Sequence, residues 1–306
     1  MSPTVLDNPA WATAQPRLSV LIPFKGDDPR PLLALLDREA APVEIVLLDD
    51  GSQDAPLSAA VTQAVAAMAL PARLVTLARN EGRAKGRNRL AAQARASHYL
   101  FLDSDMAPDR ANFLARWLDL IDVEDPAVAF GGFSLEQVVP RRDHALHRAM
   151  AAHADCLPAE VRRQQPEKHV FTSNLLVRRD VFAGEAFDEG FSGWGWEDVE
   201  WGMRVARRWP IVHIDNTATH LGLDPAPVIA AKYEQSAANF ARVVAAHRAV
   251  GETYPSYRAA RLLRYAPLLR LWRPLLKAYA LAEAAPVRSR AFARRLYRAA
   301  LYAEAV

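Results

Sequence analysis

Cysteine is almost absent from this sequence. Its 306 residues include one, Cys156, which excludes an internal disulfide and a metal site built from several cysteines. A single cysteine is typical of a reducing compartment, and we interpret Cys156 as a small buried apolar residue. The remaining composition, 51% hydrophobic and 24% charged, is that of an ordinary globular protein.

Long apolar stretches are absent as well. The opening segment, MSPTVLDNPAWATAQP, has no basic region followed by an apolar core, so we do not expect a secretory signal. The longest uncharged run, residues 55–72, is rich in alanine and contains two prolines. A membrane span needs about 20 strongly apolar residues, so this run predicts a buried helix. These absences together favour a cytoplasmic location.

Acidic and basic residues are unevenly distributed. The whole chain has a net charge of +3, but residues 255–306 hold eleven Lys and Arg against two Glu, a net +9, which leaves −6 for residues 1–254. We therefore expect a main domain over 1–254 and a separate basic extension over 255–306.

The first half alternates short apolar runs with segments of helical composition. The runs are rich in Val, Leu and Ile and too short for helices, so they predict buried strands. They cover residues 18–24, 43–49, 72–78 and 98–103, and similar runs follow at 127–133, 171–179 and 209–215. Such alternation predicts a mostly parallel central sheet flanked by helices, an α/β fold. A helix is expected from Glu197, and the chain reads as helical from Pro225 onward.

Ligands of such sheets bind beyond the carboxyl ends of the strands. The first four strands are followed by PFKGDDP, DDGSQD, RNEGRAKGRN and DSDM. Four strand ends in succession thus carry lysine, aspartate, arginine with asparagine, and paired aspartates. This convergence indicates a site at that edge of the sheet more strongly than any one motif does.

The paired aspartates are Asp103 and Asp105, one residue apart after the fourth strand. Two nearby carboxylates repel each other unless they share a cation or a proton. Carboxylates together with substrate phosphates are the ligands that Mg²⁺ and Mn²⁺ prefer. D-x-D is common in proteins, but its position directly after an apolar strand favours a metal site.

The second strand ends in a turn that contains Asp50 and Gly51, and Ser52 is suited to cap the next helix. The aspartate is also suited to accept a hydrogen bond from a base N–H or a ribose hydroxyl. A structural turn and a nucleotide contact are compatible interpretations of this motif.

Four basic residues cluster at the next helix start: Arg83, Lys85, Arg87 and Arg89. A helix N-terminus with basic side chains suits an anionic ligand such as a diphosphate. The alternative is a solvated basic face, which competes most strongly for Arg83 and Arg89.

The segment GWGWEDVEWG, residues 193–202, places three tryptophans beside three carboxylates. An aromatic face suits the C–H face of a sugar ring and excludes water, and a carboxylate can take a proton from an attacking hydroxyl. Because the acids open a helix, its dipole predicts that they stay ionised. The alternative is a helix cap beside a core tryptophan cluster.

These motifs in this order resemble those of a known family. VLIPFKG, IVLLDDGS, NEGRAKGRN and YLFLDSDM are similar to the nucleotide-binding half of family 2 glycosyltransferases, inverting enzymes of GT-A fold. TSNLLVRRDVF and FDEGFSGWGWEDVEWGMRV resemble the acceptor half of chondroitin-polymerase-type and β-1,4-galactosyltransferase-type enzymes. The resemblance covers roughly residues 17–222.

The resemblance implies a GT-A fold and a metal-dependent transfer, with Mn²⁺ or Mg²⁺. The donor would be a nucleotide-diphosphate sugar, with UDP favoured over GDP, and the acceptor a hydroxyl of a saccharide or glycolipid. On the donor side it implies that Pro23 and Lys25 line the nucleotide pocket and that Asp50 contacts the uracil. Asp103 would bind the ribose or the metal, and Asp105 the metal.

On the acceptor side, the resemblance implies that Asp198 is the catalytic base and Glu197 its acidic neighbour, with Trp194 against the sugars and Gly195 letting the loop approach them. The family often has glycine where this chain has Trp196, so we expect extra bulk at the acceptor mouth.

A third metal ligand is expected from a histidine near the end of the second half. His220 lies where the family places one. His213 is the competitor, but it sits within a predicted strand, where a satisfied core histidine is the default.

Three other interpretations were weighed. A dinucleotide-binding oxidoreductase needs G-x-G-x-x-G after the first strand, where this chain has Pro-Phe-Lys. A nucleotidyltransferase uses a similar sheet and metal, but normally has a glycine- and arginine-rich loop there. A non-catalytic carbohydrate- or nucleotide-binding module would not need both a base and three metal ligands.

The basic extension alternates arginine with leucine, tyrosine and tryptophan, which predicts two or three amphipathic helices. Such helices can lie on an anionic membrane surface, here the inner face, beside a lipid-linked or envelope glycan. They can equally pack on the main domain or form a dimer. Nothing else in the chain supports nucleic-acid binding.

Overall fold

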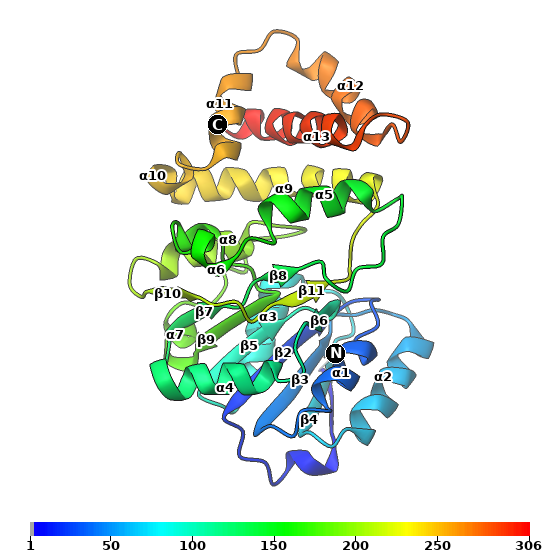
Figure 1. The fold of residues 1–306 in the computed structure, drawn as a ribbon, viewed down its shortest axis with the longest axis vertical. Coiled ribbons are helices and arrows are strands. Elements are labelled where there is room, and N and C mark those ends of the chain that lie inside the picture. The colour runs from blue at the N-terminus through cyan, green and yellow to red at the C-terminus, as the bar shows by residue number, and fades with distance from the viewer. Residues whose placement is uncertain (1–2) are drawn as a thin grey trace.

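An eight-stranded sheet forms the base of the molecule in the computed structural model, which describes residues 3–306 (Figure 1). In spatial order its strands are β1 (Thr4–Asp7), β4 (Ala72–Thr76), β3 (Val43–Asp49), β2 (Leu18–Phe24), β5 (His98–Leu102), β9 (Asn174–Arg178), β7 (Val128–Phe130) and β10 (Ile211–His213). The four central strands from β4 to β5 are parallel, and β1 and β9 run antiparallel to their neighbours.

The sequence therefore predicted the central sheet correctly. Each of the seven expected apolar runs contains one strand, and two of the first four end one or two residues early, at Thr76 and Leu102. The edge strand β1 was not predicted. Neither was a small second sheet of β6 (Met106–Pro108), β11 (Ala218–His220) and β8 (Phe133–Ser134), because two- and three-residue strands leave no periodic signal.

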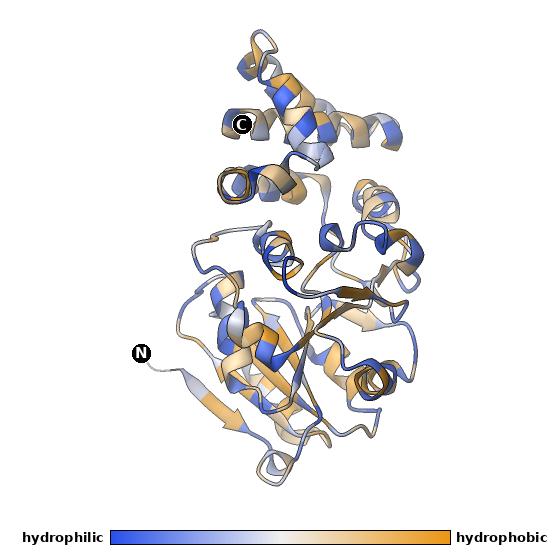
Figure 2. Ribbon diagram, turned by 90° about the vertical axis from the view of Figure 1, so that its left-hand side faces the viewer, coloured by the Kyte–Doolittle hydropathy of each residue, from blue (hydrophilic) through white to orange (hydrophobic). Residues whose placement is uncertain are grey.

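Helices cover both faces of the large sheet, as the alternating side chains of its strands require. One face packs against α1 (Arg30–Leu36), α2 (Ala55–Ala67) and α4 (Phe113–Glu124). The other packs against α3 (Arg83–Gln93), α7 (Arg179–Gly184) and α8 (Glu197–Val205). In β2, Val20 and Ile22 belong to the first core and Leu21 to the second. The strands stand out as apolar in Figure 2.

The uncharged run at residues 55–72 forms α2 and the first residue of β4. Val61 and Val65 bury one face of that helix in the first core, as expected for a helix inside the protein. None of the helices within residues 3–306 combines the length and apolarity needed to cross a bilayer.

Further helices are stacked above the sheet (Figure 1). The first layer holds α5 (Ala145–Ala154), α6 (Ala159–Arg162) and the long α9 (Ala226–Ala246). The short α10 (Arg248–Gly251) lies at the end of α9, and beyond this layer lie α11 (Pro255–Leu263), α12 (Leu269–Leu281) and α13 (Val287–Tyr302). Three helices thus form the basic extension, and α13 packs on both α9 and α5.

A third apolar cluster joins the extension to the rest of the chain. It contains Phe191, Met203, Phe240, Val243, Tyr254, Tyr257, Ala260 and Tyr302, which come from the α8 region, α9, α11 and α13. The extension therefore shares a core with residues 1–254. The division of the chain into two domains at residue 254 stays a prediction.

Candidate active site

The loops at the carboxyl ends of β2, β3 and β4 are bonded to one another. The backbone N–H of Gly26 donates to Ser52 Oγ over 2.8 Å. A Cβ on Gly51, which has φ +72°, would lie 2.5 Å from the carbonyl carbon of Arg79, so only glycine fits this contact between loops. The Ser52 hydroxyl thus joins the loop after β3 to the loop after β2. The cap of α2 is instead Asp54, which accepts from the N–H of Leu57 over 2.9 Å.

Asp50 organises the start of α3. Its carboxylate accepts hydrogen bonds from the backbone N–H groups of Glu81, at 2.7 Å, and Gly82, at 3.1 Å. Burial raises the pKa of Asp50 against the effect of these two donors. Pro23, at the end of β2, is half-buried, and Lys25 beyond it is exposed, with a charge that favours ionisation of Asp50.

The arginines of α3 connect the two halves of the chain. Arg87 is buried and donates from one terminal nitrogen to Asp103 Oδ1 over 2.7 Å, while its other terminal nitrogen is 3.9 Å from Glu197 Oε1. Arg83 donates its Nε–H to the same Glu197 oxygen. The motif after β4, the D-x-D motif and the W-E-D segment therefore meet in one cluster. Positions at strand ends predicted the meeting of the first two, but not that of the third.

This cluster sets the ionisation of its acids. Burial opposes the charge of Asp103, but Arg87 and Arg83 outweigh it, and the pKa of Asp103 falls to about 2. The same arginines lower the pKa of Glu197 despite its burial. Ser173, which the sequence did not single out, donates to Asp103 Oδ2 over 2.7 Å. The solvated-face interpretation fits Arg89, which pairs with Glu81, better than it fits Arg87.

Asp198 behaves differently from its neighbour. It lies in the first turn of α8, half-buried, and burial together with the charge of Glu197 raises its pKa to about 7 against the pull of Arg83. The expectation that the helix dipole keeps this acid ionised is therefore wrong. Desolvation and a like charge outweigh the dipole. A carboxyl with a pKa near neutrality is suited to accept and return a proton.

Asp105, directly before β6, and His220, the last residue of β11, lie together, with His220 Nε2 3.3 Å from Asp105 Oδ2. A Cβ on Gly222 would lie 1.8 Å from the same oxygen, so the chain leaves room for Asp105 only by having glycine there. Within residues 3–306, Asp105 Oδ1 is buried and has no hydrogen-bond partner.

These groups fit a hard divalent cation, because carboxylate oxygen and imidazole nitrogen suit Mn²⁺ and Mg²⁺. In the described part of the chain, however, no three His, Cys, Asp or Glu side chains are already gathered as a metal site. Asp103 is held by Arg87 and Ser173, although each of its oxygens keeps a second lone pair.

His213 is a core histidine, as its place in a strand indicated. It is fully buried, with Nδ1 3.0 Å from an Arg162 nitrogen and Nε2 3.1 Å from the carbonyl oxygen of Pro166. Burial lowers its pKa to about 4. Both ring nitrogens are used, so of the two histidines His220 is the one near the D-x-D motif.

The three tryptophans of residues 193–202 have different positions. Trp201 is fully buried against the sheet. Trp196 donates its indole N–H to Tyr302 Oη over 3.0 Å, and its ring centroid is 5.0 Å from that of Phe240. The core-cluster interpretation thus describes these two, and Trp196 packs against the extension instead of adding bulk at an acceptor mouth. Trp194 stays half-buried, 6.1 Å from the ring of Tyr233.

The loop that carries Trp194 is fixed from α9. The side chain of Asn239 donates to the carbonyl oxygens of Ser192, at 2.9 Å, and Gly195, at 2.8 Å. Gly193 and Gly195 both have positive φ, and Trp196 shares that conformation at +77°. The sequence analysis missed Asn239, because nothing local to α9 marks it as a loop anchor.

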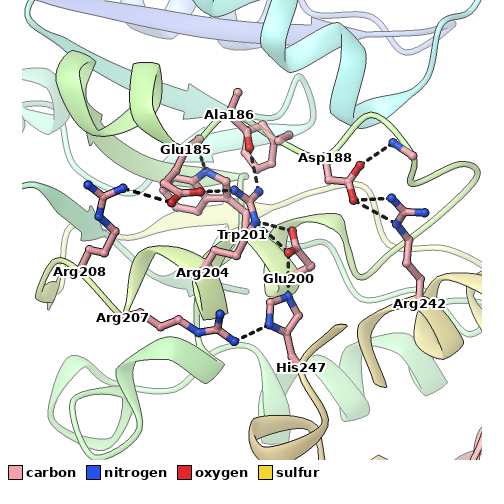
Figure 3. A network of polar contacts seen from close by, with 12 residues as sticks. Glu185, Ala186, Asp188, Glu200, Trp201, Arg204, Arg207, Arg208, Arg242 and His247 are labelled. Carbon is pink, nitrogen blue, oxygen red and sulfur yellow. Dashed lines mark hydrogen bonds and ion pairs between the residues drawn. The ribbon is translucent and has the colours of Figure 1, made fainter. Parts of the chain in front are cut away.

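The third acid of the segment, Glu200, connects α8 to His247, the residue that follows α9 (Figure 3). It accepts from Arg204 Nε over 2.8 Å and lies 2.8 Å from His247 Nε2, while His247 Nδ1 is 2.8 Å from Arg207. Arg204 also donates to Glu185. Two of the three acids therefore face the cluster with Arg83, and one holds the helix in place.

A comparison with protein families identifies the chain. The model described as glycosyl transferase family 2 matches residues 19–184, more than half of the sequence. The chain therefore belongs to glycosyl transferase family 2 and is a glycosyltransferase of GT-A-type α/β fold. The match ends before Trp194, so the acceptor-side motif lies outside it. No curated protein matches the sequence.

Solved structures share the fold over nearly the whole chain. The mannosyltransferase PcManGT from Pyrobaculum calidifontis, in complex with GDP-Man and Mn²⁺, is similar with a TM-score of 0.60 and 15% identity, over 98% of this chain and 89% of that one. S. aureus TarS 1–349 is similar with a TM-score of 0.55 and 16% identity, over 94% and 90%. The same protein in complex with UDP-GlcNAc gives 0.52.

Proposed function

We propose that the protein transfers a sugar, with inversion, from a nucleotide-diphosphate donor to a hydroxyl of a saccharide or lipid-linked acceptor. The observation that carries this proposal is the cluster in which Arg87 contacts both Asp103 and Glu197. It brings the nucleotide-side motif next to Asp198, the one acid there whose pKa is raised to about 7. A donor site and a proton acceptor thus adjoin, as a single displacement requires.

In the proposed reaction the acceptor oxygen attacks the anomeric carbon while the bond from that carbon to the diphosphate oxygen breaks. The hydroxyl proton passes to Asp198. Arg83 and Glu197 keep that carboxyl partly charged near neutral pH, since their effects on its pKa oppose each other. The half-buried Trp194 would cover the sugars and limit the access of water.

For the donor, we assign the loops after β2, β3 and β4 to the nucleotide. Pro23, Lys25 and Asp50 line that edge of the sheet, and Arg83 and Arg87 supply positive charge beside it. UDP-sugar is favoured from the sequence motifs. The solved relatives support both classes of donor, since TarS is seen with UDP-GlcNAc and PcManGT with GDP-Man.

We propose that Asp103, Asp105 and His220 would hold Mn²⁺ or Mg²⁺. The orphaned Asp105 Oδ1 and the neighbouring imidazole of His220 support this assignment. When bound, the ion would neutralise charge that develops on the departing diphosphate. The Mn²⁺ in the PcManGT complex agrees with it.

We also propose that the extension rests on an anionic membrane surface, on its cytoplasmic face. Leu268, Leu271, Leu275 and Tyr279 form one exposed apolar stripe along α12, and Leu262 and Tyr265 are exposed as well. Exposed arginines occur on α11 and directly after it, at 258, 261 and 264. Apolar side chains flanked by arginines suit the interface of an anionic bilayer.

Calorimetric titration with UDP and GDP, each with and without Mn²⁺, tests the main proposal. We expect one nucleotide to bind, and only when the metal is present. A panel of donor sugars on that nucleotide would then be tried with saccharide and lipid-linked acceptors. Absence of binding by either nucleotide with Mn²⁺ would contradict the proposed donor class.

A further inference from the structure

An arginine of the extension is buried without a partner. Arg294, on α13, is 2% exposed, and Nε and both terminal nitrogens lack a hydrogen-bond partner within residues 3–306. Taking a guanidinium out of water costs several kcal/mol unless it is paired. Arginine does not avoid this desolvation cost by losing its proton, because a guanidinium group stays protonated in proteins.

What surrounds Arg294 offsets this cost only in part. Its guanidinium carbon lies 4.7 Å from the ring centroid of Tyr233, and that of Arg298 lies 5.1 Å from the same ring. A cation over a desolvated aromatic ring is stabilised by the ring, whereas two guanidinium groups on one ring repel each other. The two guanidinium groups therefore concentrate positive charge on one ring, and within residues 3–306 no anion accepts a hydrogen bond from Arg294.

Two acidic groups lie nearby. Asp155, the residue after α5, interacts electrostatically with Arg298 and with His220. Asp224, before α9, is paired with Lys232 Nζ at 2.6 Å, and its backbone N–H donates to His147 Nδ1 over 2.8 Å. His147 in turn lies 6.0 Å from the ring of His220. The α13 arginines thus lie on the side of the site formed by α5 and α9, where Asp155 acts on Arg298 and, within residues 3–306, no carboxylate accepts a hydrogen bond from Arg294.

Tyr233 connects this pair to the catalytic loop. Its ring contacts Arg294 and Arg298 from α13 and lies 6.1 Å from the ring of Trp194. Trp194 precedes Asp198 by four residues, so an anion on the arginines would lie beside the loop that leads to the proposed base.

We propose that Arg294 and Arg298, with Tyr233, form a subsite for a phosphate-type anion carried by the acceptor. This inference rests on the proposed function and deepens it: the acceptor is an anionic, phosphate-bearing glycan or glycolipid, and the extension takes part in its recognition. Two adjacent guanidinium groups are the donors that bind phosphate oxygens in a bidentate manner.

Calorimetric titration with inorganic phosphate tests the subsite, first on the free protein and then on protein saturated with UDP and Mg²⁺. We expect phosphate to bind in both states. Arg294→Gln and Arg298→Gln should each weaken phosphate about tenfold or more, and UDP affinity should not change. The control is Arg295→Gln, an exposed arginine of the same helix, which should leave phosphate affinity as in wild type.

Thermal unfolding gives a second readout. In phosphate-free buffer, Arg294→Met should melt at a higher temperature than wild type, because it removes an unpaired buried charge. Phosphate should raise the melting temperature of wild type but not of this variant.

Two results would overturn the proposal: phosphate affinity unchanged in both glutamine variants, or competition between phosphate and UDP, which would place the arginines on the donor diphosphate. Failure of UDP to bind would instead remove the proposed function. The titration of UDP-free protein would still decide whether the arginines bind phosphate.

Discussion

Arg87 donates a hydrogen bond to Asp103 over 2.7 Å from a position where only 1% of it is exposed. The same guanidinium faces Glu197, more than ninety residues further along the chain. One buried cation thus compensates two acids that come from different halves of the protein. Its removal would leave Asp103 without its main source of positive charge and would leave Glu197 with Arg83 alone.

Arg87→Ala should therefore lower the free energy of unfolding by about 3–5 kcal/mol, the usual cost of leaving buried charge uncompensated. Urea unfolding followed by circular dichroism measures it. The matched control is Arg89→Ala on the same helix. Its partner Glu81 is partly exposed, so the expected loss is about 0–1 kcal/mol. Equal losses in the two variants would contradict this account of the cluster.

Asp198→Asn should lower kcat by about 10²–10⁴, the usual contribution of a general base, and leave nucleotide affinity unchanged. Steady-state transfer and calorimetry measure the two quantities. Wild-type turnover in the variant would remove Asp198 from the mechanism.

Glu200→Gln is the matched control for that substitution, because Glu200 is two residues away and holds α8 instead of facing the arginine cluster. It should cost about 1–3 kcal/mol of stability through lost charge-assisted hydrogen bonds, with kcat largely retained. If it lowers kcat as strongly as Asp198→Asn, the division of roles within the segment is wrong.

The pH dependence of kcat/KM should show the ionisation of Asp198. A base is inactive when protonated, so the rate should fall as the pH drops through about 7. Glu197→Gln removes a like charge and should move this acid limb to lower pH. Arg83→Gln removes an opposite charge and should move it to higher pH. Shifts in the same direction for both variants would rule out this assignment.

Gly222→Ala should lose metal-dependent nucleotide binding, as Asp105→Ala should, because the added methyl group would collide with Asp105 Oδ2. Calorimetry with nucleotide and Mn²⁺ measures the effect. Gly184→Ala is the control, since its Cβ would meet a Trp209 ring carbon at an ordinary 3.9 Å. Retained metal dependence in Gly222→Ala would mean that Asp105 is not a ligand.

Leu271→Asp and Leu275→Asp should each weaken binding to vesicles of anionic lipid about tenfold or more, because burying one leucine contributes about 1.5–3 kcal/mol. Vesicle co-sedimentation measures it. Val123→Asp, at an even more exposed site on α4, should have no effect. If neither leucine matters, the stripe on α12 has another partner.

The sheet and the ordering of its motifs could be predicted because they rest on local signals. Apolar runs of five to seven residues identify β2, β3 and β5 on their own. Polar residues at their carboxyl ends then share one edge by geometry. The same argument predicts that Asp103 and Arg87 lie near each other, and they share a hydrogen bond of 2.7 Å.

The directions of individual side chains could not be predicted. Trp196 and Trp194 are two residues apart, yet Trp196 turns into a core completed by Tyr302, because its backbone adopts a φ of +77°. The raised pKa of Asp198 depends on burial that only the packed α8 creates. The buried Arg294 looks, in sequence, like any other arginine of a basic helix.

The hydrogen bond from Trp196 to Tyr302 spans 106 positions of the chain. Ser236 and Phe240 also contact that tyrosine, at 2.7 Å between hydroxyl oxygens and 4.2 Å between rings. During synthesis, the nucleotide-binding half can form while the ribosome is still translating α9. The loop that leads to Asp198 can pack against Tyr302 only after that residue has left the exit tunnel. Nascent chains would therefore bind the donor before they could transfer its sugar.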